Sequence, residues 1–505
     1  MSKRSGKNGS SSSMHGPKKG GSLLGKKPRP KKEGSVYVRD DAPRRNQARV
    51  EEKILPQTNK RLGEFTIDRL SHDGRGVASL EGKTVFIDGA LVGEKVTARL
   101  VEDHARFIDA RIDQLIDSAP ERVLPPCEHF ASCGGCQLQY MQPATQIEMK
   151  QKAVLEQLQR WGGVVPRKIL PPITIGDRAY RSRARLGVWY EDDGSVTLGF
   201  RQRYSNAITP ISQCMVLAPE LNALLAPLHK WLSELRAAKA VTHIELVKGE
   251  KQIAVILRHT KKLAEADLAS LVQLVEQQST PQQTCTIWLE PNGNQGLTDL
   301  AGQPCDPRLV YPVAGLELAF HPQDFTQVNP QVNQEMVAQA LALLELKPGD
   351  RVLDLFCGIG NFTLPIAQHC AQVVGIEAVE SMVLRGRENA ARLQIGNATF
   401  IAANLADMTH TQLQRLGDMK AQEIAAILLD PPRDGAKDII TSILRLGAGG
   451  QLSPKRIVYV SCNPATLARD SALLAEAGYR LETLVALDMF PHTSHVESMA
   501  LFLRK

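Results

Sequence analysis

The chain from residue 331 onward constrains the fold most, because short apolar runs alternate there with helical stretches. Such alternation is typical of a doubly wound α/β domain with a largely parallel sheet. The ligand site of such a sheet lies at the carboxyl ends of its strands, so residues directly after each run are candidate functional residues. A helix is expected at 333–346, and strands at 351–355, 373–376, 399–401, 425–429, 456–460, 480–487 and 498–503.

The first two of these strands end in residues that suit an adenosine-containing ligand. The first runs into a turn containing Gly358 and Gly360, and small residues let a ligand approach the backbone closely. The second ends at Glu377, whose carboxylate can accept hydrogen bonds from both ribose hydroxyls. Thr363 stands where a dinucleotide fingerprint would have its third glycine, so the pattern favours S-adenosylmethionine over a nicotinamide cofactor.

Two further strand ends carry reactive side chains. Asp430 begins an Asp-Pro-Pro-Arg segment, and Arg433 stands where enzymes that methylate exocyclic amines have an aromatic residue. Cys462 follows the run at 456–460; it is either a buried structural thiol or a nucleophile. A thiolate that adds to C6 of uracil makes C5 nucleophilic enough to attack a methylsulfonium. A base must then remove the C5 proton; residue types alone do not choose among His492, His495 and Glu497.

A cysteine cluster lies upstream, in 127–136. Glycines separate some of its three thiols and let the backbone curl so that the sulfurs face one metal centre. A loop-like segment near 214 offers a fourth thiol. Four sulfurs suit either a closed zinc site or an iron–sulfur cluster, and the spacing does not choose between them. The clustering of the nine cysteines favours ligands and a nucleophile in a reducing cytosol over a disulfide framework. The four candidate ligands are Cys127, Cys133, Cys136 and Cys214.

The remaining segments suggest a nucleic-acid partner. Residues 1–60 carry a net charge of +11 and the rest −4, so a basic head precedes a nearly neutral body. The head is either an arm for a polyanion or a solubilising tail. Short strands from residue 63 to 112 predict a small barrel, and a helix follows at 144–161. Residues 172–325 predict an antiparallel sheet with helices, one of them at 262–278. The basic and aromatic residues of this sheet either bind RNA or form a face exposed to solvent. No apolar run approaches ~18 residues, so no membrane span is expected.

Five segments together resemble the RNA uracil-C5 methyltransferases, over roughly residues 60–505. They are Asp324–Asn329, Leu353–Thr363, Asp430–Arg433, Ser461–Asp470 and Asp488–Ser498. The similarity is strongest to members that methylate a uridine of bacterial 23S rRNA, although those carry Asp-Pro-Ala-Arg where this chain has Asp-Pro-Pro-Arg.

The resemblance implies a division of the chain and roles for its residues. It implies a disordered basic head (1–54), an OB-like TRAM barrel (55–116), a central α+β iron–sulfur and RNA-binding domain (117–325) and a Rossmann-like methyltransferase domain (326–505). The four cysteines would hold a [4Fe-4S] cluster. Cys462 would be the nucleophile and Glu497 the base, with His492 and His495 supporting. S-adenosylmethionine would contact Gln327, Phe356, Asn361, Glu377, Asn404 and Asp430.

The implied protein is a cytoplasmic, monomeric enzyme that acts on a loop or single-stranded uridine of 23S rRNA, and on neither DNA nor membranes. Two alternatives remain open. One is the tRNA uracil-C5 enzyme of the same superfamily, which lacks both the barrel and the cysteine cluster. The other is a non-catalytic iron–sulfur RNA-binding assembly factor, which would need neither Cys462 nor Glu497.

Overall fold

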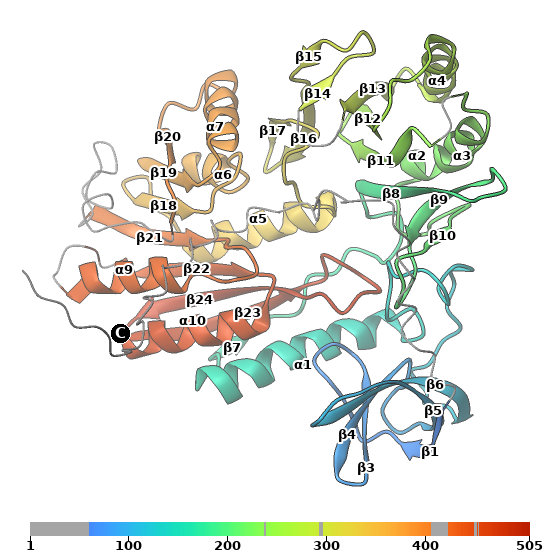
Figure 1. The fold of residues 1–505 in the computed structure, drawn as a ribbon. Coiled ribbons are helices and arrows are strands. Elements are labelled where there is room, and N and C mark those ends of the chain that lie inside the picture. Colours follow the sequence, from blue (N-terminus) through green and yellow to red (C-terminus); the bar gives the residue numbers. More distant parts are fainter. Residues whose placement is uncertain (1–59, 237–238, 292–295, 406–422, 449–451, 453) are drawn as a thin grey trace, which may run out of the picture. The chain divides into compact units, whose positions relative to one another are not determined.

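A computed structural model describes residues 60–236, 239–291, 296–405, 423–448, 452 and 454–505 (Figure 1). The described residues belong to one compact unit, and the predicted basic head lies outside them. The nine cysteines are free thiols. Within the described part of the chain, every helix is too short or too polar to cross a membrane.

The N-terminal strands form the expected small β-domain. Its six-stranded sheet has the order β1-β5-β6-β4-β3-β2, with only the β4–β6 pair parallel. Alternate residues such as Phe65, Val85 and Ile87 turn inward to a shared apolar core. The strands are β1 (Arg61–Thr66), β2 (Arg69–Leu70), β3 (Gly76–Leu80), β4 (Lys83–Asp88), β5 (Lys95–Asp103) and β6 (Phe107–Asp117).

The first helix, α1 (Pro143–Gly162), matches the predicted helix at 144–161. It begins with proline at its first turn and ends at Gly163 in the left-handed conformation, as helix sequences of this kind do. Its apolar residues, Val154 and Leu158 among them, join the core beneath α10 (Pro464–Glu476). A side chain at Gly162 would lie 2.7 Å from the Ala468 carbonyl, so glycine permits this close packing.

The central segment forms an eight-stranded sheet of order β10-β9-β8-β11-β12-β13-β14-β15. Sequence predicted it as antiparallel, and this is correct except that β12 and β13 run parallel. These two strands can run parallel because α4 connects them, and parallel neighbours need such a crossover connection. The elements are β8 (Arg183–Tyr190), β9 (Val196–Arg201), β10 (Ile208–Pro210), α2 (Pro219–Ala223), α3 (Leu225–Ser233), β11 (Val241–Lys248), β12 (Gln252–His259), α4 (Glu265–Gln278), β13 (Thr284–Pro291), β14 (Leu297–Thr298) and β15 (Pro304–Cys305), followed by the hairpin β16 (Leu309–Val313) and β17 (Leu316–Phe320).

The C-terminal sheet has the order β20-β19-β18-β21-β22-β24-β23-β7. The first five strands are parallel, and β24 runs antiparallel between β22 and β23. The expected strands are all present: β18 (Arg351–Leu355), β19 (Gln372–Glu377), β20 (Ala398–Ala402), β21 (Ile424–Leu429), β22 (Arg456–Ser461), β23 (Tyr479–Leu487) and β24 (Glu497–Arg504). The last strand of the order, β7 (Lys168–Ile169), comes from the central part of the chain.

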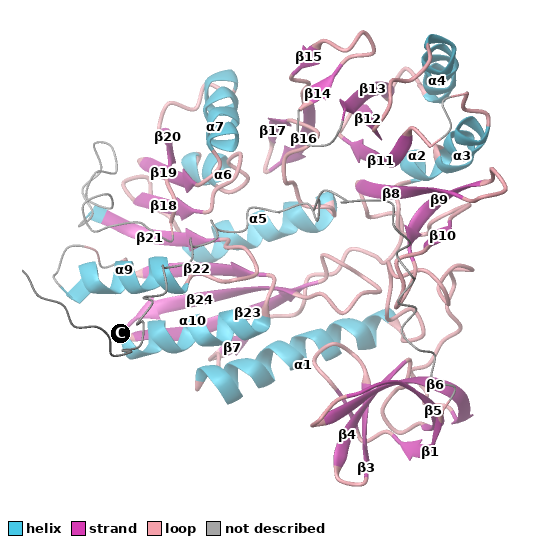
Figure 2. Cartoon of the chain, in the orientation of Figure 1, coloured by secondary structure: helices cyan, strands magenta, loops and turns pink. Residues whose placement is uncertain are grey.

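Helices cover both faces of this sheet (Figure 2). One core contains Leu353 with residues of α1, α9 (Lys437–Ala448) and α10, and the other contains Val352 with residues of α5 (Pro330–Leu344), α6 (Thr363–Ala367) and α7 (Glu380–Arg392). Burial on both faces explains why these strands read as continuous apolar runs. Strand order reverses between β18 and β21, so the carboxyl ends of β18, β19, β21 and β22 meet at one edge.

Candidate active site and cysteine loop

The loop after β18 is shaped by backbone conformations that favour glycine. Gly358 and Gly360 have positive φ values of 56° and 98°, and Phe356 shares this conformation at 67°. The Phe356 N–H donates a hydrogen bond of 2.9 Å to the Ile376 carbonyl of the neighbouring strand. The loop is thereby fixed against the end of β19.

The carboxylate of Glu377 lies against this loop. One oxygen accepts from the Gly358 N–H at 3.2 Å, and the other accepts from the Val379 N–H at 3.0 Å. Each oxygen keeps a lone pair, so the carboxylate can still accept hydrogen bonds from a ligand.

Asn361 is held by an exchange of hydrogen bonds with Asn333 of α5, 3.0 Å in each direction. The Tyr311 hydroxyl donates to the same Asn361 oxygen at 3.0 Å. Tyr311 and Asn333 also line a small cavity with Gln327, so two predicted cofactor residues share a neighbourhood. A third, Asn404, is an exposed side chain just after β20.

Buried carboxyl groups gather at the same edge. Burial, with the nearby Glu377 charge, raises the pKa of Asp430 to about 7. Asp354, inside β18, accepts a 2.5 Å hydrogen bond from the Thr363 hydroxyl, and its own burial raises its pKa to about 8. Sequence analysis missed Asp354; the available signal was a carboxylate in the middle of an otherwise apolar strand.

Cys462 and Glu497 meet because their strands are paired. Ser461 of β22 lies opposite Ser498 of β24 in an antiparallel pair. Cys462, which follows Ser461, and Glu497, which precedes Ser498, therefore lie at the same end of the two paired strands. Burial first, and then Asp430, raise the pKa of Glu497 to about 8. Burial first, and then the Glu497 and Asp430 charges, raise the pKa of the Cys462 thiol to about 12.

Arg433 opposes both of these shifts. Its guanidinium lowers the pKa of Cys462 and that of Glu497. Its carbonyl accepts hydrogen bonds from the Asn463 side chain at 2.9 Å and from the Thr466 hydroxyl at 3.3 Å. Asn463 also caps α10, so Cys462 directly precedes a helix N-terminus, which favours a thiolate.

The two histidines have different surroundings. His492 is buried, and its ring nitrogens lie 3.2 Å from the Gln146 amide and 3.1 Å from the Asp177 carboxylate. Burial lowers its pKa. His495 is exposed and lies 3.1 Å from the Arg433 guanidinium. The structure therefore turns His492 toward α1 and the 177 region and brings Glu497 beside Cys462.

The four predicted cysteine ligands lie in one neighbourhood, near enough for their charges to influence one another. Burial first, and then the thiols of Cys214, Cys133 and Cys127, raise the pKa of Cys136 to about 12. Burial likewise raises the pKa of Cys133 and of Cys214, and in both cases neighbouring thiols add to the shift. Four half-buried thiols that repel one another when ionised suit a cationic group that binds thiolates. In the described ranges, no three His, Cys, Asp or Glu side chains are grouped closely enough to hold a metal ion.

The cysteine loop, residues 127–141, contacts two other parts of the chain. Arg203 donates to the Cys133 carbonyl at 3.2 Å and to the Cys136 carbonyl, and its guanidinium lies 4.3 Å from the centre of the Phe130 ring. On the other side, the N–H groups of Gln137 and Leu138 donate to the His492 carbonyl. The loop thus connects the end of β9 with the loop that precedes Glu497.

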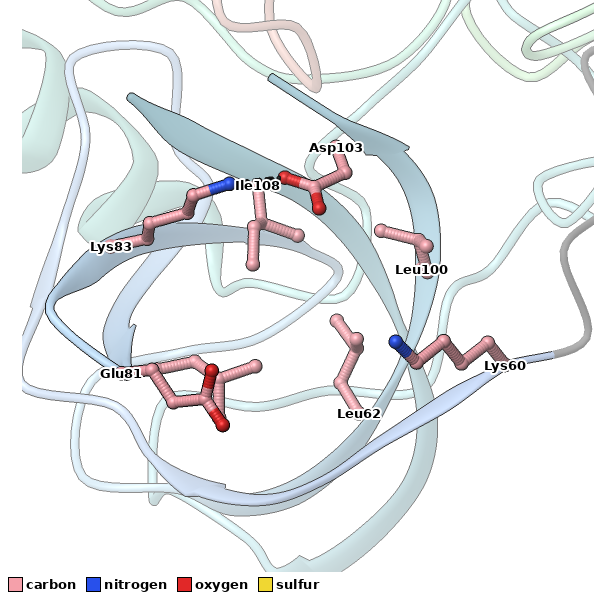
Figure 3. A pocket seen from close by; sticks show the side chains of 8 residues that line it. Lys60, Leu62, Glu81, Lys83, Leu100, Asp103 and Ile108 are labelled. Atoms are coloured by element: carbon pink, nitrogen blue, oxygen red, sulfur yellow. Dashed lines mark hydrogen bonds and ion pairs between the residues drawn. The ribbon is translucent and has the colours of Figure 1, made fainter. Parts of the chain in front are cut away.

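The β-domain has a surface pocket of its own (Figure 3). Lys60 and Lys83 border an apolar floor that includes Leu62 and Ile108. Lys83 forms a 2.7 Å ion pair with Asp103. Glu81 lines the same pocket, so the two lysines of the rim are balanced by two carboxylates and the pocket is not a cationic surface.

Comparison with known proteins gives two family matches. The family described as tRNA (Uracil-5-)-methyltransferase matches residues 145–505, and the TRAM domain matches residues 63–112. The second match agrees with the predicted barrel.

Two curated relatives extend over almost the whole chain. The 23S rRNA (uracil(1939)-C(5))-methyltransferase RlmD of Pectobacterium atrosepticum is 45% identical over 452 residues, covering 89% of this chain and 95% of that protein. The protein of the same description from Alcanivorax borkumensis is 42% identical over 453 residues, covering 89% of this chain and 98% of that protein.

A solved structure shares the fold. The Pyrococcus abyssi tRNA (uracil-54, C5)-methyltransferase, in complex with S-adenosyl-L-homocysteine, has a TM-score of 0.64 and 23% identity, covering 87% of this chain and 100% of that chain.

Proposed function

This chain belongs to the RNA (uracil-C5)-methyltransferase family, and on that basis we propose that it methylates C5 of a specific uridine in 23S rRNA. The observation that carries the proposal is the pairing of Cys462 with Glu497 at the ends of adjacent strands, in a chain similar over nearly its full length to enzymes with that described activity.

The methyl donor is S-adenosylmethionine, which supplies an electrophilic methyl group when bound. The loop at Phe356–Asn361 and the carboxylate of Glu377 would hold its adenosine part, with Gln327, Asn404 and Asp430 completing the site. The contact of Glu377 with the Gly358 N–H supports this assignment, because it fixes the carboxylate beside the loop that the donor would approach.

Cys462 acts as the nucleophile. Its thiolate adds to C6 of the uracil ring, and the electrons of the C5–C6 double bond make C5 able to accept the methyl group. The guanidinium of Arg433 and the N-terminus of α10 favour the thiolate form against the effect of burial.

Glu497 acts as the base in the second half of the reaction. It takes the proton from C5, the C5–C6 double bond re-forms, and the Cys462 sulfur leaves C6. A carboxylate whose pKa is raised to about 8 holds the C5 proton more tightly than an ordinary carboxylate, and the fraction of Glu497 that is ionised and ready to act grows as the pH rises toward 8.

A fluorine substitution tests this mechanism. RNA carrying 5-fluorouridine at the target position has no C5 proton for Glu497 to remove, so it should remain covalently attached to the protein on a denaturing gel. Cys462→Ala should form no adduct, while Cys285→Ala, on β13 in the central sheet, should form it normally. An adduct in the Cys462→Ala protein would refute the nucleophile assignment.

RNA binding would fall to the TRAM domain and the central sheet. The outward residues of β8 and β9 include Arg185, Trp189 and Arg201, and the tryptophan is 48% exposed. This combination of cations and an exposed ring suits phosphate pairing and base stacking.

Cys127, Cys133, Cys136 and Cys214 would hold a [4Fe-4S] cluster. The mutual electrostatic influence of the four thiols supports a shared ligand group. Protein purified without oxygen should contain four iron and four sulfide per chain and absorb visible light broadly. One zinc in a colourless protein would overturn this assignment.

A tRNA substrate is the second candidate, since the similar fold of the Pyrococcus abyssi enzyme belongs to a protein described as acting on tRNA. Mapping 5-methyluridine in rRNA and tRNA from cells with and without the gene separates the two. Loss of the modification from 23S rRNA alone is the expected result, and loss from tRNA alone would reverse the assignment.

A further inference from the structure

The segment 488–492, which leads from β23 toward Glu497, is held by residues from outside the methyltransferase sheet. Lys150 of α1 is 1% exposed, and its ammonium donates to the Asp488 carboxylate at 2.7 Å and to the Phe490 carbonyl at 3.0 Å. Asp488 directly follows Leu487, which pairs with Glu497 at the base of the loop. The ion pair is therefore anchored one residue from the pair that positions the base.

Gln146, about one turn earlier on α1, is also buried and contacts the same segment. Its side-chain oxygen accepts from the His492 N–H at 2.8 Å, and its amide lies 3.2 Å from the His492 ring. The same amide donates to the Leu138 carbonyl at 3.1 Å and to the Met141 carbonyl at 2.8 Å. One side chain thus joins α1, the cysteine loop and the segment 488–492.

Further contacts complete the enclosure of His492. Asp177 faces the second ring nitrogen, and the Tyr180 hydroxyl donates to the Pro491 carbonyl at 3.1 Å. His492 has a φ of 66°, a conformation that a non-glycine residue keeps only where its surroundings hold it. Segment 488–492 is therefore fixed by polar contacts that reach it from the 137–180 region.

Such an arrangement is costly to build. A buried lysine and aspartate lose hydration that apolar residues of similar volume would not lose, so packing alone does not account for the pair. We propose that Lys150 and Gln146 are positioning residues for proton removal: they fix segment 488–492 and so hold Glu497 at C5 of the substrate.

This inference rests on the proposed function, and it separates the two halves of the reaction. Cys462 follows β22, which these contacts do not touch, so thiol addition and methyl transfer should continue when they are lost. Proton removal should slow, because a displacement of about 1 Å can reduce the rate of a chemical step about 100-fold. The covalent RNA–protein adduct should then accumulate with ordinary RNA.

The test uses the full-length protein and a double substitution, Lys150→Met with Asp488→Leu. Removing only one partner would leave a buried unpaired charge, whereas replacing both with apolar residues preserves packing. The control is Lys152→Met, which changes a 77% exposed lysine on the same helix. Adduct and released product are measured in a single turnover with unmodified RNA, on a denaturing gel.

We expect the double variant to release product about 100-fold more slowly and to accumulate adduct at least about tenfold above the wild type and the control. Because the slowed step follows covalent capture of the RNA, kcat and the apparent KM for RNA should fall together and leave kcat/KM nearly unchanged. A merely structural role would lower the folded fraction without changing the ratio of adduct to product. Normal product release from a folded double variant would overturn the inference.

If the double variant does not fold, Gln146→Leu, which keeps the ion pair, takes its place. Slow product release with accumulated adduct would support the inference, and normal release from the folded variant would overturn it. The wild-type protein and 5-fluorouridine RNA provide the reference. Absence of an adduct there would refute the proposed function itself, whereas an adduct there with normal release from the variants would refute only the positioning role.

Discussion

Cys136 and Cys462 are the same residue type, and we propose two different chemistries for them in one chain. Burial is the first cause of a raised pKa in both, and in both the value rises to about 12. The remaining neighbours differ: Cys136 is surrounded by three other thiols, and Cys462 by two carboxyl groups and Arg433. Burial therefore does not distinguish the proposed ligand from the proposed nucleophile, whereas the neighbouring charges differ between them.

The sharpest test of this comparison is to delete each sulfur. Cys462→Ala should lower methyl transfer by at least about 10⁴-fold, because removing a covalent nucleophile removes its whole pathway. Transfer of a labelled methyl group to RNA in a single turnover measures the loss. Cys136→Ala should instead lower the iron content of the purified protein. Residual methyl transfer above about one per cent in the Cys462→Ala protein would show that Cys462 is not the nucleophile.

Glu497→Gln should have the next largest effect. Loss of a general base costs typically 10²–10⁴-fold, and methylated RNA should stay attached to Cys462 because its C5 proton remains. The measurement is mass spectrometry of the protein after one turnover with unmodified RNA. Glu476→Gln, the same change at an exposed glutamate at the end of α10, is the matched control and should release product within about threefold of the wild-type rate. Rapid release by Glu497→Gln would mean that another group takes the proton.

Thiol reactivity probes the charges directly. Arg433→Met removes the cation that favours the Cys462 thiolate, so the pKa of the thiol should rise and alkylation by iodoacetamide at pH 8.5 should slow about threefold to tenfold. Glu497→Gln removes a negative neighbour and should speed the same reaction. Peptide mass spectrometry follows each cysteine separately, and Cys285 serves as the internal control. An unchanged rate in both variants would show that the neighbouring charges do not control this thiol.

The smallest expected effect is on stability. The pKa of Glu497 is raised from 4.5 to about 8 in the folded protein, so between those values the unfolded chain has lost its proton while the folded chain keeps it. Stability of the wild type therefore falls as pH rises through this window. Glu497→Gln removes the penalty, so its melting temperature should exceed the wild-type value by a few degrees at pH 8, at most about ten, and by little at pH 5. For Asp430→Asn the gain should level off near pH 7, because its folded pKa is raised to about 7. A constant difference across pH would contradict these shifts.

The local patterns of the sequence predicted the C-terminal sheet well. Residues 351–355 and 425–429 are buried on both faces, and such strands leave continuous apolar runs that a reader can recognise. The helix at α1 and its glycine end were equally visible, since capping signals are local. The gathering of polar residues at the carboxyl edge followed from the strand order rule.

What the sequence could not predict depends on long-range contact. No local feature of Lys150 indicates a partner 338 residues later. For the same reason, the sequence could not predict that α1 packs against the methyltransferase sheet or that β7 pairs with β23 at its edge. His492 and Glu497 lie five residues apart in one motif, so residue type could not separate them. Their difference appears only where the folded chain turns one toward Gln146 and the other toward Cys462.

The register between β22 and β24 has a consequence for how this enzyme can change. Cys462 and Glu497 are separated by a helix, a strand and a loop, yet their distance is set by the backbone ladder at Ser461 and Ser498. Added residues at the exposed turn between α10 and β23 should leave the chemistry intact, whereas deleting one residue inside β24 would invert its side chains and remove the carboxylate from the crevice. The turn between α10 and β23 should therefore accept insertions, whereas β24, only some twenty residues later, should not accept a deletion.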